Sequence, residues 1–85
     1  MKQDEQDIQF MSLIMSLQAS AWTMLGKTIN PATGKTEKNL EGAKATIDIL
    51  IMLKEKTKGN LSKAEQDFLS SIVQQLELNY VETKK

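Results

Sequence analysis

The sequence predicts an all-α fold, a three-helix domain with a long polar loop between the first two helices. Two observations predict this class: apolar residues recur at helical spacing in three segments, and glycines or polar loops separate those segments. At 85 residues, the chain can bury only about 60% of its unfolded surface. It has no cysteine for a disulfide or a thiolate metal site, so we expect dimerisation to complete the fold.

The first helix is expected at residues 6–25. Asp4, Glu5 and Asp7 suit the positive end of its dipole, and Gly26 suits its end. Seven apolar residues share one helical face and form the predicted inward stripe: Phe10, Leu13, Ile14, Leu17, Ala21, Met24 and Leu25.

Residues 26–38 form the predicted polar loop. Within it, the run from Asn30 through Pro31 to Gly34 has the composition of a turn. The flanking pairs Thr28-Ile29 and Lys35-Thr36 could form a very short hairpin, and an irregular loop is an equal alternative.

The second helix is expected at residues 40–58, after the N-cap residue Asn39 and before Gly59. Its inward stripe is Leu40, Ala43, Ile47, Leu50 and Ile51. The third helix is expected at residues 63–81, because Ser62 and Glu65 have the spacing of a capping box. Its inward stripe spans about 140° and comprises Phe68, Leu69, Ile72, Val73, Leu76 and Tyr80.

The first two helices carry more apolar surface than three helices can bury among themselves. Ile8, Met11, Met15 and Trp22 widen the apolar arc of the first helix to about 220°, and its remaining side has small residues and no charge. Monomers rarely expose such patches, so we predict self-association, with a deeper intramolecular core as the alternative. The candidate self-association surface is Ile8, Met11, Met15, Gln18, Trp22, Ala45, Ile49, Met52 and Leu53.

The second-helix members of this surface lie opposite the main stripe of that helix. Gln18 could hydrogen-bond across a symmetric interface and fix its register, or lie exposed at the rim.

Composition argues against an enzyme, because the chain has no histidine, cysteine or arginine. We expect no cofactor and no metal, since the acidic residues near helix starts are explained by the helix dipole. Net charge is zero and no basic stripe is present, so we expect no nucleic-acid partner.

Residues 8–26 are uncharged, but Gln9 and Gln18 argue against a membrane span. The acidic start differs from a secretory signal, so we expect a cytoplasmic protein.

Several short runs carry a resemblance to a known family: residues 10–17, Leu25-Gly26, Asn30-Pro31-Ala32-Thr33-Gly34, Asn39-Leu40, Thr46-Ile47-Asp48, Gly59-Asn60-Leu61 and Tyr80-Val81. Together they resemble the bacterial family of small helical proteins named domain of unknown function 1844. The resemblance covers nearly the whole chain and implies a short, helical, intracellular protein without an assigned ligand or catalytic residue. Family members commonly have an arginine shortly before the Tyr80-Val81 pair, where this chain has Leu78 and Asn79, so a role of a cationic group at that place does not carry over from the family.

Taken together, these expectations favour a homo-oligomeric helical interaction module, most simply a dimer, with an unidentified further protein as an additional partner. The alternative is a small-molecule or lipid-binding helical protein whose apolar faces enclose a pocket.

Overall fold

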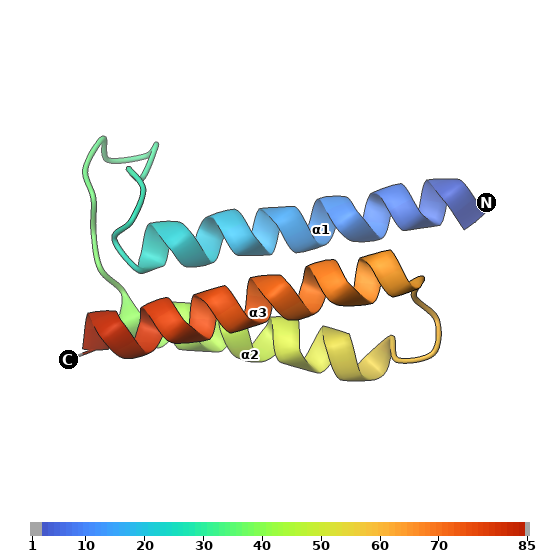
Figure 1. Ribbon diagram of the computed structural model, residues 1–85. Coiled ribbons are helices and arrows are strands. Elements are labelled where there is room, and N and C mark those ends of the chain that lie inside the picture. Colours follow the sequence, from blue (N-terminus) through green and yellow to red (C-terminus); the bar gives the residue numbers. More distant parts are fainter. Residues whose placement is uncertain (1–2, 85) are drawn as a thin grey trace.

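The structure is a computed structural model that describes residues 3–84, with side chains described from residue 7 onward. It contains three α-helices, namely α1 Gln3–Met24, α2 Leu40–Lys56 and α3 Lys63–Lys84 (Figure 1). No strand occurs in residues 3–84. The prediction of an all-α, three-helix fold is therefore confirmed.

The three helices form a short bundle in which each helix contacts the other two. α2 runs antiparallel to α1 and α3, and the segment between α1 and α2 projects from one end of the bundle (Figure 1). The Cα radius of gyration is 13.7 Å, whereas a compact chain of this length has about 12 Å. The described part of the chain is therefore an open, thin bundle, with a narrowest extent of 17 Å.

α1 starts three residues before the predicted residue 6, and the C-terminal ends of α1 and α2 lie within two residues of their predicted positions. α1 ends at Met24, and the chain reverses at Gly26, whose φ is +77°. Asn39 caps α2 as expected, because its side-chain oxygen accepts the Gly42 N–H at 3.0 Å. α2 ends at Lys56 rather than residue 58, since the Lys58 N–H bonds the Glu55 carbonyl and tightens the last turn.

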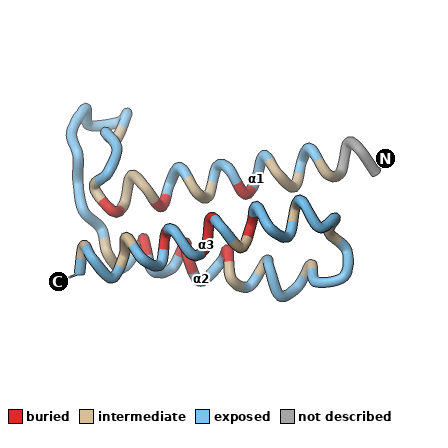
Figure 2. Tube along the Cα trace, viewed as in Figure 1, coloured by how far each residue is buried: buried red, intermediate tan, exposed pale blue. Residues whose placement is uncertain are grey.

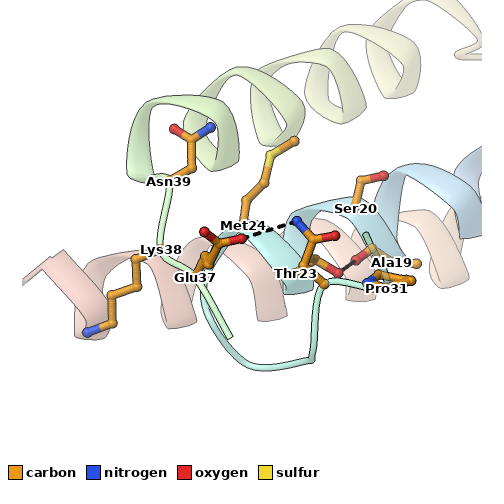
Figure 3. Close-up of a pocket in the computed structure, with 9 residues that line it drawn as sticks. Ala19, Ser20, Thr23, Met24, Pro31, Glu37, Lys38 and Asn39 are labelled. Carbon is orange, nitrogen blue, oxygen red and sulfur yellow. Dashed lines mark hydrogen bonds between the residues drawn. The ribbon is translucent and has the colours of Figure 1, made fainter. Parts of the chain in front are cut away.

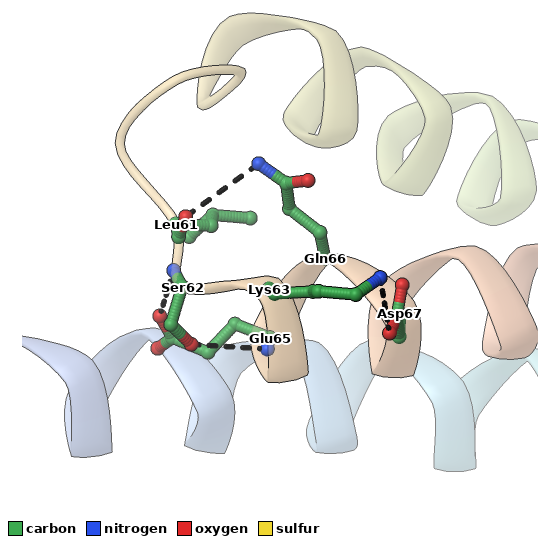
Figure 4. A network of polar contacts seen from close by, with 6 residues as sticks. All are labelled: Leu61, Ser62, Lys63, Glu65, Gln66 and Asp67. Atoms are coloured by element: carbon green, nitrogen blue, oxygen red, sulfur yellow. Dashed lines mark hydrogen bonds and ion pairs between the residues drawn. The ribbon is translucent and has the colours of Figure 1, made fainter.

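A reciprocal capping box starts α3 (Figure 4). The Ser62 N–H donates to Glu65 Oε1 at 2.9 Å, and the Glu65 N–H donates to Ser62 Oγ at 3.2 Å. These are the two bonds that the spacing of serine and glutamate predicts. The far end of α3 extends three residues beyond the predicted residue 81, to Lys84.

The segment between α1 and α2 is a turn held by single pairings rather than a hairpin of strands. The Asn30 N–H donates to the Lys35 carbonyl at 2.8 Å, and an isolated antiparallel bridge joins Leu25 to Lys38. Gly34, with a φ of +70°, donates to the Asn30 carbonyl and closes the turn. Of the two alternatives that the sequence left open, the pairing of Thr28-Ile29 with Lys35-Thr36 does not form, because Lys35 pairs with Asn30 instead.

The core is one cluster of buried residues contributed by all three helices and by the residue that follows α1 (Figure 2). Among the described side chains, ten apolar ones are buried there: Ile14, Ala21, Leu25, Ala43, Ile47, Leu50, Leu69, Ile72, Val73 and Leu76. Two residues assigned to inward stripes, Leu13 and Phe68, are instead exposed. In α1 the inward side is centred on Ile14 and Ala21, and Leu13 points about 100° away from Ile14, leaving it 47% exposed.

Candidate functional site

The outward side of α1 is an exposed helix surface without charge. No charged residue occurs from Ile8 to Leu25, although this stretch of helix has a solvent-facing side. Ile8 is 67% exposed and Met15 is 56% exposed. Successive α-helical residues are rotated by 100°, so six residues share an outward arc of about 100°. We call this surface the α1 outer face: Ile8, Ser12, Met15, Ser16, Ala19 and Thr23.

The two halves of the α1 outer face differ in side-chain size. Its N-terminal half carries the large apolar side chains, and no described side chain of α1 before Ile14 is buried (Figure 2). Its C-terminal half carries Ser16, Ala19 and Thr23, which leave the helix backbone open to close approach. The face is therefore knob-like at one end and flat at the other.

The other α1 members of the predicted surface lie at the inner edge of the helix. Met11, Gln18 and Trp22 are half-buried, and Trp22 packs against the core. The indole therefore contributes to the fold of the single chain. Gln18 lies neither fully buried nor exposed, so its role in an interface stays a prediction.

On α2, the predicted residues divide between two environments. Ala45, Ile49 and Met52 are exposed, as expected for a second apolar strip. Leu53 was expected opposite the main stripe, but it is half-buried and packs against the core. It is turned about 60° from the buried Leu50, close enough to reach the core from the edge of the inward arc.

The exposed residues of α1 and α2 do not form one continuous face. The Met24 side chain points toward α2, where its sulfur lies 3.6 Å from the Thr46 hydroxyl oxygen (Figure 3). Ile8 and Met15 are rotated about 160–180° from Met24 around α1, so they lie on the edge away from α2. The structure therefore separates the α1 outer face from the apolar strip of α2.

A groove that sequence reasoning missed lies beside the C-terminal half of the α1 outer face (Figure 3). Its volume is about 610 Å³. Ala19, Thr23 and Met24 line it from α1, and Pro31 and Lys38 are among the residues that line it from the segment leading to α2. We call it the α1–loop groove. Its first wall could be found from the small residues of α1, but its second wall depends on how residues 26–38 fold back.

Hydrogen bonds hold the α1 wall and the start of the loop together. The Thr23 hydroxyl donates to the Ala19 carbonyl at 3.0 Å. Since its proton is used there, the Thr28 hydroxyl donates to Thr23 Oγ1 across a distance of 2.9 Å. Further along, the Asn39 N–H donates to the Met24 carbonyl at 2.7 Å. The connecting segment is therefore bonded to α1 at both ends.

The turn is braced in the same way around Glu37. The Glu37 carboxylate accepts a hydrogen bond from the Thr33 hydroxyl at 2.9 Å. It also accepts one from the Asn30 side-chain amide at 3.5 Å, drawn as a dashed line to Glu37 in Figure 3. The Ala32 N–H donates to the Asn30 side-chain oxygen at 2.9 Å. These polar groups bond one another, so the groove is a preformed shape with an apolar patch at Met24 and Pro31.

Charge is unevenly distributed between the two ends of α1. Asp4, Glu5 and Asp7 stand at its start, and the side chains of Asp4 and Glu5 lie outside the described ones. Beyond its end, the connecting segment carries three exposed lysines and one glutamate: Lys27, Lys35, Lys38 and Glu37. One end of α1 is thus acidic by sequence, and the segment at the other end is basic.

Some charged groups elsewhere on the bundle have structural partners. Glu65 caps α3, and Asp67 is paired with Lys63 at 3.3 Å (Figure 4). Lys44 and Asp48 form an exposed pair on α2 at 3.1 Å.

Among the residues that the structure describes, no group of three or more acidic side chains could hold a metal ion. Within the same part of the chain, no helix has the length and apolarity needed to cross a membrane.

Comparison with known proteins identifies a family. The family model described as Domain of unknown function (DUF1844) matches residues 7–82. The match includes nearly all of the three helices and the whole connecting segment that forms the groove. No curated protein and no solved structure matches the chain.

Proposed function

Because the chain belongs to the family named domain of unknown function 1844, whose description assigns no activity, we propose a function from its surface. We propose that it is a non-catalytic interaction module that forms a homodimer through the α1 outer face. The observation that carries this proposal is the exposure of Ile8 and Met15 on a helix side that has no charge.

The energetic argument concerns what this face gains when it is covered. Full burial of an isoleucine or methionine side chain is worth about 1.5–3 kcal/mol. A symmetric dimer would cover Ile8 and Met15 of both copies, a gain comparable with the total stability of many small domains. The bundle is thin, and ten apolar residues are buried among its described side chains, so covering this face would supply a large part of the stability of the fold.

Shape and charge favour a second copy as the partner. Ser12, Ser16 and Ala19 have small side chains, so a facing helix can approach to about 8–10 Å between axes. The formal net charge of the chain is zero, so two copies experience no overall repulsion. An isologous dimer also uses one patch twice, which doubles the area covered by a single helix face.

A small-molecule or lipid-binding role is the second candidate, favoured by the apolar patch of Met24 and Pro31 in the α1–loop groove. Native mass spectrometry of the purified protein tests it, since a bound compound adds mass to the monomer or dimer. Homodimerisation is the stronger proposal because Ile8, the most exposed of the large apolar residues whose side chains the structure describes, lies outside the residues that line this groove.

Sedimentation equilibrium at 1–100 µM (about the range of moderate dimers) tests the proposal. We expect twice the chain mass of 9.5 kDa for the wild type, and a monomer for Met15→Glu, because a charge would be buried in the interface. Leu78→Glu is the matched control, since Leu78 on α3 is 59% exposed and Met15 is 56% exposed. It should stay dimeric.

A wild-type mass of 9.5 kDa across this range would contradict the proposal, as would dissociation by Leu78→Glu alone. Far-UV circular dichroism must accompany the measurement. If Met15→Glu loses its helices on becoming monomeric, the dimer supports the fold itself, which is consistent with an obligate dimer.

A further inference from the structure

Resting on the homodimer proposed above, we infer that the two α1 helices pair antiparallel. In this arrangement, the N-terminal half of α1 from each copy enters the α1–loop groove of the other. The groove therefore has a named occupant, a segment of a second copy of the same chain.

The shape of the α1 outer face favours antiparallel over parallel pairing. A two-fold axis between Met15 and Ser16 places Ile8 of one copy opposite Thr23 of the other, and Ser12 opposite Ala19. The knob-like half of each helix then meets the small residues that line the groove of its partner. A parallel pair would instead place Ile8 against Ile8 and leave both grooves uncovered.

Charge complementarity also favours antiparallel pairing. In the antiparallel arrangement, the acidic start of one α1 arrives beside the connecting segment of the other copy, which bears three lysines and one glutamate. Opposite charges then meet at both ends of the interface. In a parallel pair the two acidic starts would lie together and the basic segments would lie together, which is repulsive.

The area that a stable dimer needs indicates that the groove belongs to the interface. α1 has 22 residues and is about 33 Å long, so a helix-wide strip of its surface covers about 400 Å². Stable interfaces bury about 800 Å² per partner. The helix face alone is too small, and the walls of the groove supply a further contact that occurs twice in the dimer.

Disulfide cross-linking tests the geometry directly, because the chain has no native cysteine. Ser16→Cys, near the proposed axis, should form a cross-linked dimer by itself on mild oxidation. Ser12→Cys and Ala19→Cys should each remain uncross-linked alone and give a heterodimer when mixed, since a disulfide requires Cα atoms within about 7 Å. Non-reducing electrophoresis reads the result.

The outcomes separate this inference from the dimer on which it rests. If the wild type sediments as a monomer, both proposals fail. If it sediments as a dimer but Ser12→Cys and Ala19→Cys each cross-link to themselves, the pairing is parallel and only the antiparallel inference fails. A dimer with no cross-link at any of the three positions also overturns it, because another face then forms the contact.

Charge reversal in the segment provides a second measurement. Lys27→Glu with Lys35→Glu should raise the dimer dissociation constant by about tenfold at low ionic strength, an effect that high salt should suppress. The control, Lys56→Glu with Lys58→Glu, changes the net charge equally at the opposite end of the bundle and should have a much smaller effect. An equal effect of both pairs would show that net charge, and not the groove, determines the change.

Discussion

The first turn of α3 depends on two side chains, Ser62 and Glu65, which bond each other's backbone N–H groups. We expect Ser62→Ala to lower the free energy of unfolding by about 1 kcal/mol, because the Glu65 N–H loses its acceptor. Glu65→Gln should lower the free energy of unfolding by less, because the glutamine side-chain oxygen can also accept the hydrogen bond from the Ser62 backbone N–H. Urea denaturation at fixed protein concentration measures both. Ser71→Ala, at an exposed position within α3, is the control and should show no loss.

Gly42, in the first turn of α2, illustrates a residue whose role only the packing explains. Alanine in place of an exposed helical glycine usually stabilises a helix by about 1 kcal/mol. At Gly42, however, a Cβ atom would lie 2.7 Å from the Asn39 side-chain nitrogen and 3.0 Å from the Met24 sulfur. Asn39 would have to move and weaken its cap, so we expect Gly42→Ala to lower the melting temperature. A clear increase would contradict the close packing of α1 against α2.

Residue-level predictions from sequence succeeded where the interaction is local. Asn39 and Gly42 are three residues apart, as are Ser62 and Glu65, so spacing alone determines those hydrogen bonds. Leu13 was assigned to the wrong environment because its burial depends on the rotation of α1 against its neighbours. An apolar arc as wide as that of α1 does not specify which of its edges faces inward.

At the scale of the element, α2 offers a direct comparison of its two faces. Leu50 is completely buried, and its neighbour Ile49 is 43% exposed. We expect Leu50→Ala to lower the free energy of unfolding by about 2–5 kcal/mol and Ile49→Ala to lower it by less than about 1 kcal/mol, because only the first leaves a cavity. Chemical denaturation of the two variants at one concentration makes the test. Comparable losses would show that the outer strip of α2 is also covered in the native assembly.

The three helices were predictable because caps, glycines and apolar spacing agree at each boundary. The α1–loop groove was not, because it forms between α1 and a segment whose path depends on long-range pairings. The bridge between Leu25 and Lys38 spans thirteen positions, and no turn motif specifies it. Of the candidate surface, the exposure of Ile8, Met15 and Met52 followed from helical spacing, whereas their division between two faces required the relative placement of α1 and α2.

At the scale of the whole molecule, the thin bundle and the uncharged α1 outer face have a common explanation. A chain of 85 residues can place only one side of α1 against α2 and α3, so the opposite side stays in solvent unless a second chain covers it. In a monomer, exposing this uncharged side to water costs free energy, whereas in an oligomer its burial contributes favourable free energy. Stability and association are therefore expected to be linked.

That linkage predicts a melting temperature that depends on protein concentration. Unfolding of a dimer releases two chains, so a hundredfold increase in concentration stabilises the dimer by about 2.7 kcal/mol and should raise the melting temperature by several degrees. Differential scanning calorimetry at about 3 and 300 µM (a hundredfold range) measures this shift. Met15→Glu should melt lower and with no dependence on concentration, while Leu78→Glu should retain the wild-type dependence. A wild-type melting temperature that is the same at both concentrations would mean that a single copy carries the full stability, with Ile8 and Met15 left in water.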